Sequence, residues 1–187
     1  MAAIVRTLLP RRYNWVLYRA GHLPRPDITD LSVELVAPRQ PLTPAQRAYL
    51  GQHIRRFNLW YLLRWQRSGQ GWLFLARCPA EYGHYTFVTP GCRYRRFFPI
   101  ITEPRALLIG PCLTEAELRG RTIYPRVLQH VVGLLGERGY GPFYIDTSLD
   151  NVASIRGMEK AGFTRCGVWS GTRVLWNLLI WGRRTAD

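Results

Sequence analysis

The residues best suited to joint chemistry lie between Leu107 and Leu135, where a predicted strand leads through a turn into a long helix. The turn is Arg119–Tyr124. The first N–H groups of a helix have no partner within it and carry the positive end of its dipole, so they bind anions. Gly120 lets the backbone turn tightly, and Arg119 and Arg121 add positive charge. An ordinary turn with solvated arginines would have the same sequence, because short glycine loops are weak evidence.

Four carboxylates near the later strands are candidates for a general base, which has to lie within hydrogen-bond reach of the proton it removes. They are Glu103, Glu115 and Glu117, which flank the predicted strand 106–113, and Asp146 in the apolar strand 143–147. Loop carboxylates are mostly solvated, whereas Asp146 is either a partnered buried acid or a site residue. His84, in an aromatic strand, is a candidate for an acceptor pocket, although a lone histidine is more often satisfied core or surface.

The hydrophobic pattern predicts the elements that position these residues. Strands are predicted over 32–36, 72–77, 82–89, 97–101, 106–113, 143–147, 164–169 and 174–181, and helices over 43–56, 59–66, 122–137 and 152–161. Residues 1–30, rich in Arg and Pro, are expected to form an irregular leader, and residues 31–187 a single domain. The order predicts a mixed sheet with helices on its faces, α/β or α+β by class.

A second motif follows the strand 143–147. It reads Asn151-x-x-Ser154-x-x-x-Met158-Glu159-Lys160-Ala161-Gly162-Phe163. Together with the Arg119–Tyr124 turn it resembles the GCN5-related N-acetyltransferase (GNAT) family. In that family a strand leads to a loop of pattern Arg/Gln-x-x-Gly-x-Gly/Ala and a helix, and a later strand leads to an Asn, a helix and a Glu-Lys-x-Gly-Phe ending. The predicted order of elements matches that fold over roughly residues 32–181.

The resemblance implies a mixed, mostly antiparallel sheet of six to seven strands, with helices on both faces and splayed central strands. The strands that part would be 106–113 and 143–147, and Gly110-Pro111 interrupts the first of them. The pantetheine arm of the donor would enter the gap. The residues implied to bind the donor are Ile109, Gly110 and Leu113 through their amides, Arg119, Gly120, Arg121, Thr122, Ile123 and Tyr124 at the diphosphate, and Asn151 and Ser154.

The implied activity is transfer of an acetyl group from acetyl-CoA, as co-substrate, to an amine of a small acceptor, with no metal. The amine attacks the thioester directly, amides stabilise the charge that develops on oxygen, and Asp146 or Glu115 takes the amine proton. The family's general acid is a tyrosine at the position of Met158, so Ser154, one turn earlier, or water would serve here. Asn151 would orient the pantetheine or cap the helix.

Two residues of the turn depart from the family pattern. Thr122 and Tyr124 stand where glycine or alanine is usual, and Pro125 removes one backbone donor. A β-carbon at Thr122 prevents the closest approach of a phosphate, although its hydroxyl could cap the helix or bind the phosphate instead. Tyr124 is equally explained as a packing residue.

The composition fits one domain of 187 residues with ample apolar and aromatic material for a core. The net charge of +14, carried almost entirely by scattered arginines, favours anionic partners without choosing one. Four widely spaced cysteines suggest neither zinc nor a disulfide framework. The short apolar N-terminus is not a membrane span, so we expect a cytoplasmic protein. The sequence leaves a homodimer open.

The acceptor is less defined. Aromatic residues and arginines between Trp60 and Arg96 would suit an anionic acceptor such as a nucleotide-linked amino sugar, and they equally suit core aromatics under a solvated basic face. Three alternatives stay open: a regulator that binds coenzyme A without turnover, an acyltransferase that uses acyl carrier protein, and a basic nucleic-acid-binding module. We do not expect the last, because the two motifs favour an acyl donor.

Overall fold

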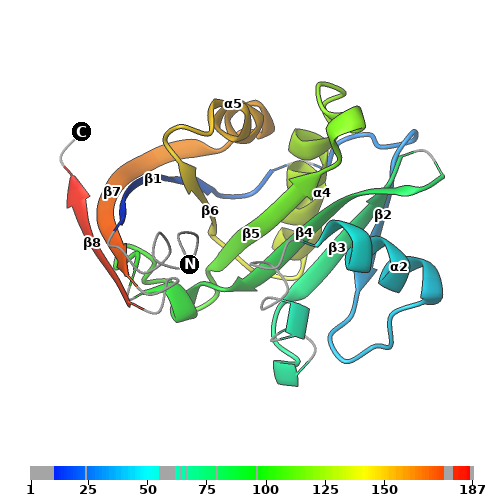
Figure 1. Cartoon of the computed structure of the whole chain (residues 1–187), viewed down its shortest axis with the longest axis horizontal. Coiled ribbons are helices and arrows are strands. Elements are labelled where there is room, and N and C mark those ends of the chain that lie inside the picture. Colours follow the sequence, from blue (N-terminus) through cyan, green and yellow to red (C-terminus); the bar gives the residue numbers. More distant parts are fainter. Residues whose placement is uncertain are drawn as a thin grey trace, which may run out of the picture.

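The computed structural model describes residues 11–185 apart from 24, 55–61, 64, 66, 79, 96 and 175–178. Within this part, eight strands form one sheet in the order β2-β3-β4-β5-β6-β1-β7-β8, and only the β5–β6 pair is parallel (Figure 1). The strands are β1 (Arg11–Ala20), β2 (Ser32–Val36), β3 (Trp72–Arg77), β4 (Tyr82–Pro90), β5 (Leu107–Thr114), β6 (Phe143–Ser148), β7 (Thr164–Val174) and β8 (Leu179–Thr185). The predicted mixed, mostly antiparallel sheet is confirmed, with one strand more than the upper count expected.

The additional strand is β1, which lies in the segment expected to be an irregular leader. It pairs antiparallel with β6 on one side and β7 on the other, so it is an interior strand. Trp15, Val16, Leu17 and Tyr18 are all buried. A strand covered on both faces has a continuous apolar run in place of the alternation of a half-exposed strand. The leader interpretation is therefore wrong for residues 11–20, because their apolar residues form a continuous run without the alternation that identifies a half-exposed strand.

The strand predicted over 97–101 is also absent. These residues form turns after a short 3₁₀ helix, η1 (Gly91–Tyr94). Pro99 has no N–H for a sheet ladder, and Phe98 and Ile101 are buried in one cluster with residues of β1, β5, β6 and β7. The helix predicted over 59–66 lies mostly outside the described residues, of which 62, 63 and 65 are helical.

Three α-helices among the described elements cover both faces of the sheet. Helices α4 (Ile123–Glu137) and α5 (Val152–Ala161) pack on one face, in a cluster with residues of β1 and β3 to β7. Helix α2 (Pro44–His53) packs on the opposite face over β3 and β4, and it begins with the predicted capping box of Thr43 and Gln46. Helix α4 connects the two parallel strands, so its first turn lies at the end of β5.

Candidate active site

Strands β5 and β6 part soon after they begin to pair (Figure 1). Their parallel ladder joins Leu107–Ile109 to Phe143–Ile145, and within the described chain no later residue of β5 pairs with β6. Strand β5 continues to Thr114 and β6 to Ser148, so the two strands flank an opening in the sheet. The predicted splay of the central strands is confirmed.

The opening begins at a bulge in β5. The β5 residues Ile109 and Cys112, three apart, pair with β4 residues only two apart, which leaves Gly110 and Pro111 outside the ladder. Gly110 has a φ of 134°, and a β-carbon placed there would meet no atom within 4 Å. A glycine at this point therefore permits the bend and leaves space beside the strand. The Gly-Pro pair in the sequence correctly predicted this irregularity.

The amides that face the opening differ in part from those expected. The N–H of Glu115 donates to the carbonyl oxygen of Gly83 on β4, at 3.0 Å. Because amide directions alternate along a strand, the N–H of Leu113 also faces β4 and belongs to that ladder. The donor contact expected at the amide of Leu113 is thus moved to the amides of its two neighbours in the strand, Cys112 and Thr114. By the same alternation the amides of Cys112 and Thr114 face away from β4, toward the opening, while Gly110 lies at the bulge and Ile109 is the last β5 residue that pairs with β6.

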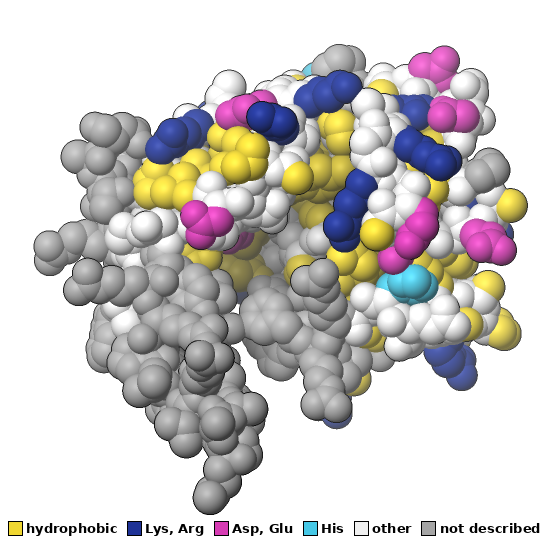
Figure 2. Space-filling model, turned by 45° about the horizontal axis from the view of Figure 1, so that its top comes forward, with side chains coloured by type: hydrophobic (Ala, Val, Ile, Leu, Met, Phe, Trp, Pro, Cys, Tyr) yellow, Lys and Arg dark blue, Asp and Glu magenta, His cyan; other side chains and the backbone are white. Residues whose placement is uncertain are grey.

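The turn from β5 into α4 is open to solvent. Arg119, Gly120 and Arg121 are exposed, and the described chain offers no acceptor to the N–H groups of residues 120–124. Gly120 has a φ of 81°, and a β-carbon there would meet nothing within 4 Å. Figure 2 shows a hollow on this side of the molecule, with apolar side chains in its depth and basic side chains on its rim. Unpaired donors at a helix N-terminus beside guanidinium groups fit a diphosphate.

Thr122 departs from the expected capping role. It occupies the N-cap position of α4 with φ 59° and ψ 14°, in the left-handed region, and its side chain makes no capping hydrogen bond. A β-branched residue is a conformational outlier in this region. The backbone therefore keeps the conformation that glycine favours although the residue is threonine.

Tyr124 lies between α4 and α5, and its ring fits against Gly157. A β-carbon on Gly157 would come within 2.5 Å of Cδ1 of Tyr124, so only glycine gives the ring this space. The phenol oxygen lies 3.3 Å from Oγ of Ser154. Burial raises the pKa of Tyr124 above its usual range, and the nearby Cys112 and Asp146 raise it further. The tyrosine is thus a packing residue whose hydroxyl stays protonated close to the opening.

Asp146 and Cys112 lie on the two strands that part. Burial raises the pKa of the Cys112 thiol to about 12, and the charge of Asp146 contributes to that rise. Asp146 acts on Cys112 and on Tyr124, so the three side chains belong to one neighbourhood at the opening. Asp146 is half-buried. The sequence placed Asp146 here, whereas nothing in the spacing indicated Cys112.

His84 is a core residue. Its side chain is fully buried, with Nδ1 2.7 Å from Oγ1 of Thr114 and Nε2 2.7 Å from Oγ1 of Thr86. Burial lowers the pKa of the imidazole to about 3, so the ring is neutral. Both ring nitrogens are occupied by threonine hydroxyls. Of the two explanations that the sequence left open for His84, the structure supports the satisfied core residue.

Glu115 is held by two side chains of α2. Its Oε2 lies 2.8 Å from Nδ1 of His53, and its Oε1 accepts a hydrogen bond from the Tyr49 hydroxyl at 3.2 Å. The rings of Tyr49 and His53 stack with centroids 4.9 Å apart. A histidine whose Nδ1–H is bound by a carboxylate presents Nε2 as a base. His53 and Tyr49 were missed from sequence because their proximity to Glu115 depends on how α2 packs on the sheet.

The remaining candidates lie apart from this arrangement or have structural partners. Glu103 accepts a hydrogen bond from Tyr144 and lies near Arg19, and Glu117 is exposed in the 3₁₀ helix η2 (Ala116–Leu118). Asn151 caps α5 by accepting from the N–H of Ser154, at 3.2 Å. The capping explanation for Asn151 is therefore confirmed. Met158 is completely buried.

The described residues also bear on two other types of site. They contain no group of three or more His, Cys, Asp or Glu side chains arranged to hold a metal ion. Among the same residues, no helix has the length and hydropathy needed to cross a bilayer.

No protein-family model matches the sequence, and no curated protein is similar to it in sequence. Solved structures share its architecture. A GNAT-family acetyltransferase from Novosphingobium aromaticivorans has a TM-score of 0.57 over 87% of this chain and 64% of its own, at 16% identity. Another from Colwellia psychrerythraea has a TM-score of 0.60 over 86% of this chain and 55% of its own, at 16% identity. The chain has the GNAT fold.

A third structure with the GNAT fold is the glucosamine N-acetyltransferase region of a fungal multi-domain β-N-acetylglucosaminidase. Its TM-score is 0.59 over 86% of this chain and 20% of its own, at 12% identity. The GNAT resemblance predicted from the two motifs is confirmed at the level of the fold. This chain spans 64% and 55% of the lengths of the first two structures.

Proposed function

We propose that the chain is an N-acyltransferase that moves an acetyl group from acetyl-CoA to an amine of a small acceptor by direct attack. The observation that carries the proposal is the opening between β5 and β6 beside unpaired amides at the start of α4. The GNAT fold supports general acyl transfer. The donor, the acceptor and the assignment of residues are the parts proposed here.

The residues around the opening fit the donor in three places. The amides of residues 120–124, with Arg119 and Arg121, would hold the diphosphate. The amides of Cys112 and Thr114 would bind the pantetheine along β5. The donor supplies an activated acyl carbon in a thioester. Gly110, beside open space at the bulge, offers its N–H to the oxygen on which negative charge develops.

Tyr124 is suited to assist departure of the thiol. When the amine nitrogen bonds to the acyl carbon, the carbon–sulfur bond breaks and sulfur takes the electron pair. The raised pKa of Tyr124 keeps its O–H intact, so the hydroxyl donates a hydrogen bond to sulfur. Ser154, 3.3 Å from the phenol oxygen, orients that hydroxyl. The donor thus comes from α4, whereas Met158 on α5 is core.

His53 and Glu115 are the better pair for the amine proton. Glu115 binds Nδ1 of His53, so Nε2 is the nitrogen left to accept the proton on the α2 side of the sheet. Tyr49 fixes the carboxylate. Asp146 is the second candidate, because it lies at the opening itself. The sequence expectation for Glu115 is thereby changed from base to a residue that orients the base.

An amino sugar is the acceptor class to test first. One structure with this fold acts on glucosamine, and the arginine-rich surface suits an acceptor that also carries a phosphate or nucleotide. A radiolabelled acetyl-CoA assay over free and nucleotide-linked amino sugars tests this class. Transfer to none of them would remove the amino-sugar part of the proposal.

The donor site is tested by binding. Thermal shift and calorimetry with coenzyme A should show stabilisation, and Arg121→Glu should weaken binding by about 10-fold or more because it reverses a charge at the diphosphate. Arg138→Glu, at the other end of α4, is the matched control and should bind within about 2-fold of wild type. Equal loss in both variants, or no binding by wild type, would reject the donor site.

The same experiment separates the alternatives. Binding of coenzyme A without turnover of acetyl-CoA over the acceptor panel indicates a regulator. Stabilisation by acyl carrier protein alone indicates that carrier as the donor. A nucleic-acid module would bind single-stranded DNA or RNA with steep salt dependence that coenzyme A does not relieve.

A further inference from the structure

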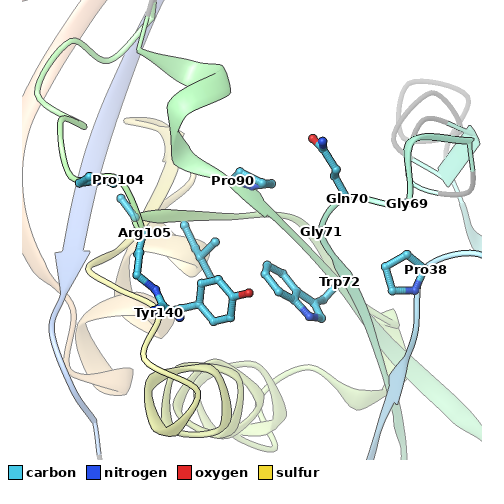
Figure 3. Close-up of a pocket in the computed structure, with 11 residues that line it drawn as sticks. Pro38, Gly69, Gln70, Gly71, Trp72, Pro90, Pro104, Arg105 and Tyr140 are labelled. Atoms are coloured by element: carbon cyan, nitrogen blue, oxygen red, sulfur yellow. The ribbon is translucent and has the colours of Figure 1, made fainter.

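A cavity lies at the opposite end of β5 from the α4 turn. It has a volume of about 450 Å³ and lies where β3 and β5 begin and β4 ends (Figure 3). Its lining includes Gln70, Trp72, Pro90, Arg105, Leu107 and Tyr140. Strand β5 starts at this cavity, reaches the bulge at Gly110 after roughly 10 Å, and ends before the α4 turn after roughly 23 Å, at about 3.3 Å per residue. The cavity is therefore separate from the proposed diphosphate site at the α4 turn.

Aromatic rings and a guanidinium group form one side of this cavity. The rings of Trp72 and Tyr140 meet edge to face with centroids 4.8 Å apart. The guanidinium carbon of Arg105 lies 4.9 Å from the centre of the Tyr140 ring. Figure 3 shows these three side chains converging from different segments of the chain. Such a surface binds planar ligands by stacking and edge contacts.

The rim of the cavity is positively charged. Arg105, Gly69 and Gln70 line the cavity. Beside them, Arg39 packs against Gly69, and Arg93 donates to the side chain of Gln70. Within the described chain, none of the three arginines forms an ion pair, and no acidic residue lines the cavity. Three guanidinium groups without carboxylate partners favour a ligand that carries an anionic group.

The walls are fixed before any ligand binds. Arg105 donates from Nη2 to the carbonyl oxygen of Arg138 at 2.9 Å, and its own carbonyl accepts from the N–H of Gly141 at 3.0 Å. Gly71 has a φ of 96°, and a β-carbon on it would lie 2.4 Å from the carbonyl oxygen of Val88. The chain therefore passes too close to β4 for any other residue. A preformed wall lowers the ordering cost of binding.

We propose that this cavity binds a nucleoside monophosphate or a closely similar anion that carries a planar ring. The ring lies against Trp72 and Tyr140, and the phosphate is bound by the rim arginines. The volume lies within the range of a few hundred Å³ found for small-molecule sites. The inference does not depend on the proposed acyl transfer, because it concerns residues at the other end of β5.

Isothermal titration of the full chain with AMP tests the site, with adenosine and inorganic phosphate as fragments. We expect AMP to bind with a dissociation constant below about 1 mM, and each fragment about 10-fold or more weakly. Arg105→Gln should weaken AMP binding by about 10-fold, and Arg93→Gln, on the exposed rim, gives a second reading if Arg105→Gln fails to fold. Arg156→Gln on α5 is the control and should bind AMP as wild type does.

The titration is repeated with saturating coenzyme A, which shares an adenosine phosphate with the probe. Unchanged AMP affinity supports a separate site. Competition between the two would place AMP at the α4 turn and overturn the proposal. No AMP binding up to about 10 mM, equal affinity for AMP and inorganic phosphate, or wild-type affinity in both arginine variants would also overturn it. A protein that binds AMP without binding coenzyme A would fail the proposed function and keep this site.

Discussion

Replacement of Thr122 by glycine should stabilise the protein and leave coenzyme A binding at least as tight. Thr122 holds φ 59° and ψ 14° at the first turn of α4, and its hydroxyl caps nothing. Glycine adopts this conformation without a steric penalty, so the substitution removes a cost and sacrifices no hydrogen bond within the chain. It also removes the β-carbon from the point where a phosphate would approach the backbone.

The expected gain follows from two opposing terms. The left-handed conformation costs a residue with a β-carbon about 1–2 kcal/mol. Glycine also gives the unfolded chain more conformational freedom, which offsets about 0.4–1 kcal/mol of the stabilisation gained by removing that cost. From the midpoints of the two ranges, the net stabilisation is about 0.8 kcal/mol. A chain of this size gains about 2–4 °C per kcal/mol, so Tm should rise by about 1–4 °C.

Scanning calorimetry of Thr122→Gly and Thr122→Ala measures this difference. Alanine also loses the hydroxyl but keeps the β-carbon, so its Tm should not rise. Calorimetric titration with coenzyme A then shows whether the glycine variant binds more tightly than alanine. Equal Tm for the two variants, or a lower Tm for glycine, would refute a left-handed backbone at Thr122.

Three further perturbations test other parts of the fold and site. Gly157→Ala should lower the free energy of unfolding by about 1–3 kcal/mol, although alanine normally stabilises a helix relative to glycine, because the new β-carbon meets the Tyr124 ring. In a double-mutant cycle, the same substitution in a Tyr124→Ala background should cost much less. In the folded protein His84 has a pKa of about 3, so it does not bind the proton that it binds in the unfolded chain below pH 6.5. Stability should therefore fall as the pH is lowered from 6.5 to 3, by up to about 1.4 kcal/mol per pH unit. His84→Gln should flatten the pH dependence of stability measured by urea unfolding over that range, and an unchanged slope would contradict the burial of His84. Glu115→Gln should lower kcat for acyl transfer by about 100-fold with little change in the Kd of coenzyme A, whereas exposed Glu81→Gln should leave both unchanged; a loss confined to donor binding would exclude a role in proton transfer.

The fold was largely accessible from sequence because its signals are local. Thr43 and Gln46 mark the start of α2, Gly162 the end of α5, and the apolar face of α4 its extent. The splay was predictable because Gly110-Pro111 interrupts β5 at one place. Strand β1 was missed because a run buried on both faces has no alternation to detect, and the strand predicted over 97–101 failed because apolar residues also fill a loop that packs against the sheet.

The candidate site was only partly accessible, for a physical reason. Backbone donors at the α4 turn follow from a glycine and a helix start, which lie together in the sequence. The side chains that complete the site come from distant elements: His53 is brought to Glu115 by the packing of α2, and Tyr124 to Ser154 by the glycine at Gly157. Contacts of that kind depend on tertiary packing, which a single sequence does not encode in its spacing.

The short β5–β6 ladder divides the sheet into two antiparallel ribbons, β2 to β5 and β6 to β8 with β1, joined by three residue pairs. Buried side chains on both faces join the ribbons as well, from α4 and α5 on one face and from Phe98 and Ile101 on the other. A molecule lodged in the gap would supply the cross-links that the backbone lacks. Occupancy of the site would therefore determine how rigidly the two ribbons move as one body.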